Sequence, residues 1–317
     1  MTLRILKFHF ILLGLVVGLG MAGCSSPTPI PPVATATPPA ETVAVATLAP
    51  TVAGPLPTAI PAAAVVNGQV ISLADFEAAV ARRRAAFEAL GQPVPEEPLL
   101  QQQVLDQMID EVLMVQSANQ LGLVVTPEEL EAAYLAAITD QGSPDAFAEW
   151  LNFSQLTDEQ FRTQLATELL IGKAATQIAD SVPTETQQVN ARHILVADEA
   201  TARDLLARIQ AGEDFATLAV EFSLDQGSRI NGGDLGWFPR GVLTVPQVEE
   251  TAFGQAPGDL SEPVQSFLGY HLVQTLQIED NYPLSPEVRS VLQRNAVDSW
   301  LVNLRTQAVV ERFVAQP

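Results

Sequence analysis

The chain has 317 residues, a formal net charge of -21 and a single cysteine. So acidic a chain is repelled by nucleic acid and by anionic lipid surfaces, so neither is expected as a direct partner. One cysteine excludes an intramolecular disulfide framework. The acidity fits a generic solvated surface, and attraction of basic client chains is the alternative explanation.

The N-terminal residues have the pattern of an export signal. Two basic residues precede the apolar stretch Phe8–Met21, which is too short and too thinly flanked for a membrane span and is typical of a secretory leader. The sequence Met21-Ala22-Gly23-Cys24 resembles the lipobox of bacterial lipoproteins, in which the cysteine is lipidated. We therefore expect a lipoprotein signal peptide over residues 1–23 and an extracytoplasmic protein anchored to the bacterial cell membrane by a lipid on Cys24. The alternative is an ordinary signal peptide with an incidental cysteine.

The segment from Ser25 to about Ala63 is mostly Pro, Thr, Ala and Val, and Glu41 is its one charged residue. Such a composition buries too little apolar surface to offset the entropy of ordering, and its prolines favour extended polyproline II. Residues 24–63 are thus predicted to be a lipidated cysteine followed by a disordered stalk. At about 3.1 Å per residue the stalk spans on the order of 100 Å. Reach through an envelope and a simple tether are both compatible with it.

A mainly helical region is predicted over residues 64–183. It begins with an apolar strand pair around the Asn67-Gly68 turn. Ser72 can cap a helix that begins at Leu73. Apolar residues recur at helical spacing from there to about Leu90, and Gly91 ends the helix.

Further helices follow the same rules. A second helix is predicted from about Leu99 to Gln120 from its apolar periodicity. Capping boxes at Thr126 and Thr157 begin two more, the latter running from Asp158 to Asp180.

The C-terminal segment, residues 284–317, is also predicted to be helical. Ser285-Pro286-Glu287 opens a helix that runs to about Phe313. Its apolar positions form a seam that needs a partner: Val288, Val291, Leu292, Val297, Leu301, Leu304 and Ala308.

Residues 186–280 contain several short motifs that follow one another in a particular order around two histidines. His193 lies in Ala191–Val196 and His271 in Gly269–Val273, and between them come Ser223-Leu224-Asp225 and Gly232–Phe238. Over roughly Gln188 to Ile278 this order and spacing resemble a parvulin, a peptidyl-prolyl cis/trans isomerase. The resemblance implies a small antiparallel sheet flanked by helices that catalyses rotation of X-Pro bonds in a client polypeptide.

Helices before a parvulin domain and a long helix after it resemble the secreted foldases and chaperones of the PrsA and SurA type. The resemblance implies an α+β protein whose helical N-terminal domain is completed by the C-terminal helix, with the parvulin domain inserted between them. The alternative for the last helix is a free amphipathic helix or a dimerisation coil.

The resemblance also implies the site. His193 and His271 are the paired central histidines, and Asp225 stands beside the rotating carbonyl. Either histidine could instead be structural, and the apolar residues could be simple core. Val248 stands where phenylalanine is usual, which would loosen the pocket, and Leu268 stands where serine or an aromatic is usual. The substrate-binding residues implied are Leu235, Leu243, Val248, Phe253, Ser266 and Leu268.

The reaction requires no covalent intermediate, and we expect no metal and no cofactor. The stretch Val196–Ala200 after the first histidine has two acidic residues and no base, so it would repel a phosphorylated substrate. The expected client is an unfolded or nascent secreted polypeptide with X-Pro bonds. The leading hypothesis is a membrane-anchored isomerase that assists the folding of secreted proteins. A non-catalytic chaperone whose parvulin domain only binds peptide or supports the fold is the alternative.

Overall fold

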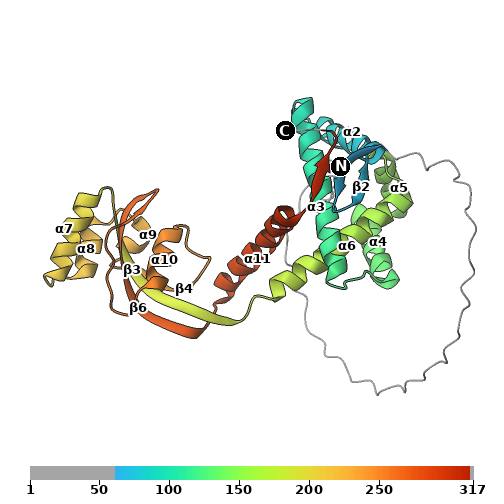
Figure 1. Ribbon diagram of the computed structural model, residues 1–317. Coiled ribbons are helices and arrows are strands. Elements are labelled where there is room, and N and C mark those ends of the chain that lie inside the picture. The colour runs from blue at the N-terminus through green and yellow to red at the C-terminus, as the bar shows by residue number, and fades with distance from the viewer. Residues whose placement is uncertain (1–60, 315–317) are drawn as a thin grey trace, which may run out of the picture.

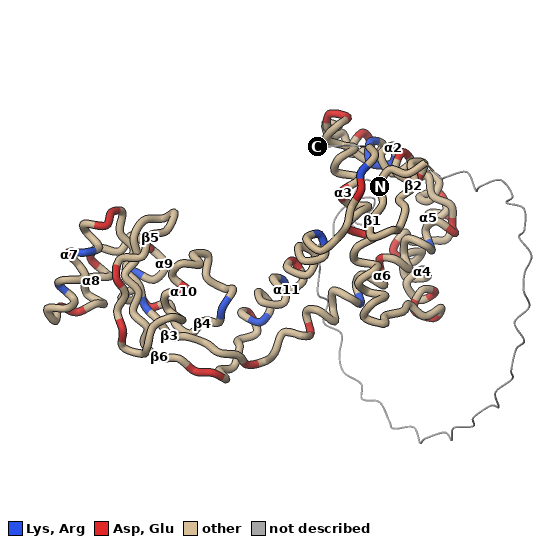
Figure 2. Tube along the Cα trace, viewed as in Figure 1, with Lys and Arg blue, Asp and Glu red and all other residues tan. Residues whose placement is uncertain are grey.

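The computed structural model of the protein describes residues 61–314 (Figure 1). The predicted signal peptide, Cys24 and nearly all of the predicted stalk lie outside these residues. Figure 1 shows two lobes: a mainly helical lobe, which contains both ends of the described chain, and a second lobe built around a sheet. Figure 2 shows Asp and Glu in both lobes, so the acidic residues are not confined to one of them.

The helical lobe begins with a hairpin whose turn follows from its sequence. Asn67 and Gly68 both have positive φ, 49° and 85°, which a two-residue hairpin turn of this hand requires and which Asn-Gly adopts at little cost. The lobe contains β1 (Ala62–Val66), β2 (Gln69–Ser72), α2 (Leu73–Ala89), α3 (Glu97–Gln120), α4 (Pro127–Gln141), α5 (Pro144–Phe153) and α6 (Asp158–Asp180).

The predicted caps are confirmed. Ser72 accepts a hydrogen bond from the Asp75 amide, and Thr126 and Thr157 each form a reciprocal capping box. Each cap satisfies backbone N–H groups that the first helical turn leaves unpaired. Helix α5 was not predicted; its Phe147 and Trp150 pack with Phe161 of α6 in an aromatic cluster.

The C-terminal helix, α11 (Pro286–Gln307), is shorter than predicted. The prediction that it runs to about Phe313 is wrong, because the chain becomes extended at Ala308 and forms β7 (Val310–Arg312). β7 pairs with β1 in the sheet order β2-β1-β7, which gives the edge of β1 a hydrogen-bonded partner. The β-branched residues Val309 and Val310 favour this extended end.

Helix α11 contacts α3 and α6, so the expectation that it completes the helical lobe is confirmed. Its most buried residue is Trp300, which the predicted seam omitted; its indole Nε1 donates to Ser117 Oγ of α3 at 3.0 Å. Of the predicted seam residues, Val297 and Leu304 pack against the core cluster that contains Trp300 together with alanines of α3 and α6.

The second lobe is an antiparallel sheet in the order β4-β3-β6-β5. Its strands extend slightly beyond the predicted limits of 186 and 280. Its elements are β3 (Glu185–Val196), α7 (Glu199–Gln210), α8 (Phe215–Phe222), α9 (Gln226–Arg229), β4 (Asp234–Pro239), α10 (Pro246–Gly254), β5 (Val264–Ser266) and β6 (Gly269–Pro283).

Strand alternation divides this lobe into two cores. Ile194 and Leu272 pack with residues of α7 and α8, whereas Ala191 and Val273 pack with residues of α10. Successive side chains of a strand point to opposite faces, so His193 and His271 continue the face that α10 covers.

No helix within residues 61–314 is both long and apolar enough to cross a membrane.

Candidate functional site

The two histidines are brought together by neighbouring strands. In the β3–β6 ladder, Leu195 lies opposite His271 and His193 lies opposite Val273. The imidazole rings stack with centroids 5.4 Å apart, and the two Nδ1 atoms are 3.2 Å apart. His193 is 7% exposed and His271 is fully buried. Each ring nitrogen therefore depends on protein partners.

Asp225 holds the outer nitrogen of His193. It caps the short helix α9, and its Oδ2 lies 2.8 Å from His193 Nε2. Ser228 joins the same group, with its hydroxyl 2.5 Å from Asp225 Oδ2. Ser228 was not among the site residues predicted from the sequence, although its position three residues after an N-cap aspartate could have indicated it.

Ser266 holds the outer nitrogen of His271. Its Oγ lies 2.7 Å from His271 Nε2 and accepts the Leu268 amide at 3.1 Å. The hydroxyl proton of Ser266 is thus available to the ring.

These contacts form a hydrogen-bond chain whose direction follows from the tautomers of the two rings. An ionised Asp225 can only accept, so His193 Nε2 donates to it, and in the tautomer that carries its single proton on Nε2 the Nδ1 atom of His193 is an acceptor. His271 Nδ1 then donates to His193 Nδ1, which leaves His271 Nε2 to accept from Ser266. The chain runs in one direction from Ser266 to Asp225.

Burial and hydrogen bonding set the charges of this chain. Burial raises the pKa of Asp225, but hydrogen bonds from Ser228, His193 and Gly227 outweigh it, so the pKa falls to about 2. Burial and the nearby His193 lower the pKa of His271 to about 4, with a smaller opposing effect from Asp225. At neutral pH the site therefore contains a carboxylate and a neutral His271.

Two glycines allow the strands to approach closely around the histidines. A Cβ at Gly233 would lie 2.2 Å from the carbonyl oxygen of His193, and a Cβ at Gly269 would lie 2.3 Å from that of Val196. Both residues also have positive φ. A side chain at Gly269 would force β6 away from β3, and one at Gly233 would force the segment before β4 away from β3 at His193.

An apolar cluster lies beneath α10, on the same face of the sheet as the histidines. Its partly buried members Leu235, Leu243 and Phe253 form the wall of this cluster. Val248 is 2% exposed within the same cluster, so it supports this wall from behind, and a phenylalanine there would have to displace neighbours. Among the apolar residues predicted to bind substrate, these four therefore belong to one cluster, in which Val248 is buried core.

Leu268 does not belong to that cluster and lies in the turn between β5 and β6. It is 48% exposed, and its neighbour Phe267 is 77% exposed. The Leu268 backbone amide, rather than its side chain, is what connects it to the histidines, through Ser266.

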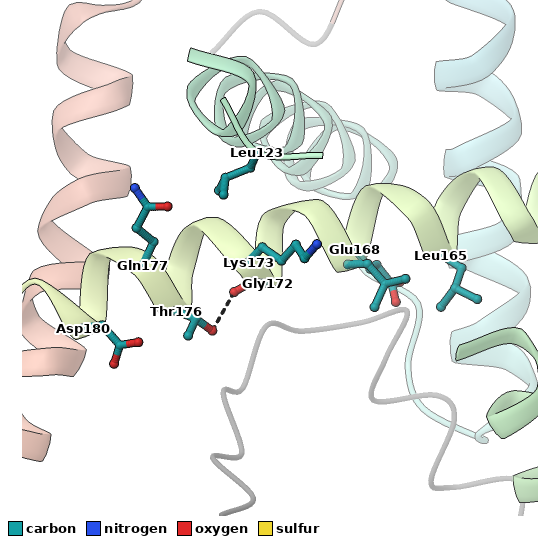
Figure 3. A pocket seen from close by; sticks show the side chains of 9 residues that line it. Leu123, Leu165, Glu168, Gly172, Lys173, Thr176, Gln177 and Asp180 are labelled. Atoms are coloured by element: carbon teal, nitrogen blue, oxygen red, sulfur yellow. Dashed lines mark hydrogen bonds between the residues drawn. The ribbon is translucent and has the colours of Figure 1, made fainter. Parts of the chain in front are cut away.

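The helical lobe has a separate open hollow of about 780 Å³ along α6 (Figure 3). Its apolar lining includes Leu123, Leu165 and Leu169. Glu168 also lines it; burial, and secondarily Glu111, raises the pKa of Glu168 to about 7.

The depressed pKa of His271 predicts a pH-dependent stability. The unfolded chain binds a proton at His271 near the ordinary pKa of 6.5, but the folded chain does so only near 4. The unfolded state therefore takes up more protons as the pH falls from 6.5 to 4, and stability falls by about 3 kcal/mol over that range. Asp225 adds a further loss below its ordinary value of 3.8.

Urea unfolding of the wild type and of His271→Gln at pH 7 and pH 4.5 isolates the contribution of His271, because the two proteins share all other titratable groups. The free energy of unfolding should fall more steeply in the wild type. Parallel pH profiles would contradict the depressed pKa of His271.

The chain matches known protein families in both lobes. A family model described as a PPIC-type PPIase domain matches residues 177–279, and one described as a SurA-like N-terminal domain matches residues 44–175. The chaperone SurA of Methylococcus capsulatus is 40% identical over 141 residues, which cover 39% of this chain and 31% of SurA.

Longer matches are foldases. The foldase protein PrsA of Caldanaerobacter subterraneus subsp. tengcongensis is 31% identical over 270 residues, 78% of this chain and 81% of the relative. PrsA of Halalkalibacterium halodurans is 32% identical over 244 residues, 72% and 69% of the two chains. The solved structure of PrsA from Bacillus anthracis matches at 27% identity and a TM-score of 0.42, over 64% of this chain and 94% of that one. The chain belongs to the PrsA foldase family and is a peptidyl-prolyl isomerase of the PPIC type.

Proposed function

We propose that this chain is a lipid-anchored, extracytoplasmic foldase that isomerises X-Pro bonds in unfolded secreted polypeptides, with His193, Asp225 and His271 as its catalytic residues. The assignment of the site rests on the continuous hydrogen-bond chain that links Ser266, both histidines and Asp225. This hydrogen-bond chain ends on the face of the sheet that also contains the apolar cluster under α10.

The reaction needs a surface that binds the twisted amide better than the planar one. Amide resonance imposes a barrier of about 18–20 kcal/mol on the C–N bond and places negative charge on the carbonyl oxygen of the planar form. Twisting the bond removes that resonance and returns electron density to nitrogen. Any group that disfavours the planar form relative to the twisted form therefore lowers the barrier.

Asp225 is suited to that role. Its pKa of about 2 keeps it ionised at neutral pH, and its side chain is 32% exposed. A carboxylate beside the carbonyl oxygen repels the planar amide more than the twisted amide, because the planar oxygen is more negative. We propose that His193, held in place by His271, fixes this carboxylate and shapes the pocket.

The apolar residues hold the proline ring in this proposal. Leu235, Leu243 and Phe253 provide a partly buried wall, and Val248 packs behind it. Ser266 orients His271, and Leu268 borders the site at the β5–β6 turn.

The helical lobe holds the client chain in this proposal. The hollow along α6 offers leucine side chains to an apolar client residue and Glu168 to a basic one. The acidic segment Asp198-Glu199 after β3 makes a non-phosphorylated client the expected substrate.

An isomerase assay tests the catalytic assignment. In a protease-coupled assay with Ala-Xaa-Pro peptides, Asp225→Ala and His271→Gln should each lower kcat/KM at least tenfold, because each breaks the hydrogen-bond chain. Asp204→Ala, on the exposed surface of α7, is the matched control and should leave kcat/KM unchanged.

The outcomes separate the two functions considered. A folded wild type that accelerates no peptide of an Xaa-Pro panel would leave only the chaperone alternative. An active wild type whose Asp225→Ala and His271→Gln variants keep full activity would remove these residues from the catalytic site.

Anchoring is tested through Cys24. In the bacterial host, Cys24→Ala should move the mature protein from the membrane fraction to the soluble fraction, or leave the leader uncleaved, because the acidic body has no affinity of its own for an anionic bilayer. A variant that is processed normally and still fractionates entirely with membranes would refute the lipid anchor.

A further inference from the structure

Helix α11 connects the two lobes physically (Figure 1). Its C-terminal half is fixed in the helical lobe by the hydrogen bond from Trp300 to Ser117 and the ion pair of Arg305 with Asp110. Near its start, the Arg289 guanidinium donates to the carbonyl of Val182 at 3.0 Å. The helix is therefore held at both ends by residues outside the isomerase sheet.

The middle of α11 touches the loop between β4 and α10. The Asn295 side-chain amide donates to the Gly241 carbonyl oxygen at 2.8 Å. Leu292 lies one turn earlier, and its Cδ2 is 3.8 Å from the position that a Cβ on Gly241 would occupy. Gly241 has a φ of 83°, so the loop turns sharply at this contact.

The same loop residue is also fixed from the isomerase side. The Gly241 amide donates to the Glu249 carboxylate of α10 at 2.9 Å. The Gly241 peptide groups are thus held between α10 and α11.

This loop carries part of the wall described above. Leu243 lies two residues after Gly241 and packs in the apolar cluster. Arg240, one residue before it, places its guanidinium 4.2 Å from the centre of the Phe253 ring. A shift of Gly241 would therefore displace Leu243, which is part of the wall, and Arg240, which contacts it.

We propose that Asn295 is a positioning residue of the isomerase: through Gly241 it sets the place of Leu243 and so lets the helical lobe shape the proline pocket. The inference rests on the proposed function in taking Leu243 as part of that pocket. Leu243 meets the proline ring in the planar and the twisted amide alike. Losing its position should therefore weaken substrate binding more than it slows turnover.

The test uses the full chain and separates kcat from KM by NMR exchange measurements on an Xaa-Pro peptide. Asn295→Ala should raise KM about threefold to tenfold, the factor that one hydrogen bond is worth, with kcat changed less than twofold. Asn295→Asp keeps the size of the side chain but replaces the donor with an acceptor, so KM should rise at least as much. Asn303→Ala, exposed on the same helix, is the matched control and should behave as the wild type.

Hydrogen exchange of the amides of residues 240–245 gives a second readout that does not depend on turnover. It should accelerate in both Asn295 variants and not in Asn303→Ala. Wild-type exchange in this loop, or wild-type KM in both Asn295 variants, would overturn the positioning role. If Asn295→Ala fails to fold, Asn295→Asp and Leu292→Ala decide it. An inactive wild type would refute the proposed function, and loop exchange would still decide whether α11 holds the loop.

Discussion

The close approach of two buried histidine rings is the constraint on which the isomerase lobe depends. Two Nδ1 atoms 3.2 Å apart can share only one proton between them when both rings are neutral, so each ring fixes the tautomer of the other. The outer nitrogens then need an acceptor on one side and a donor on the other. Asp225 and Ser266 meet these needs. Gly269 gives β6 room to approach β3, and Gly233 gives the segment before β4 room to approach β3 at His193.

The helical lobe contributes stability and placement. A helix from the end of the chain packs on α3 and α6, and the strand after it closes the small sheet beside β1. The isomerase sheet is thereby inserted between segments that pack with each other. Its long strands β3 and β6 lead directly into the helical lobe, and α11 lies against the β4–α10 loop. The helical lobe, which we propose holds the client, is thus also packed against the helix that contacts the β4–α10 loop.

Local interactions were predictable from the sequence and non-local ones were not. The Asn67-Gly68 turn and the caps at Thr126 and Thr157 follow from residues a few positions apart, and all were found as predicted. The spacing of the parvulin motifs placed both histidines and Asp225 in one family pattern. By contrast, the pairing of β7 with β1, the bond from Trp300 to Ser117 and that from Asn295 to Gly241 join residues far apart in the chain. Periodicity alone contains no information on such partners, so it extended α11 too far.

Nitrogen-15 NMR of the imidazole rings in the mature chain at pH 7 measures the direction of the hydrogen-bond chain. The third histidine, His9, lies in the predicted leader and would not interfere. We predict that His271 is neutral with its proton on Nδ1 and that His193 carries a proton on Nε2. A neutral His271 with its proton on Nε2 would contradict the chain, because Ser266 could then no longer donate to it.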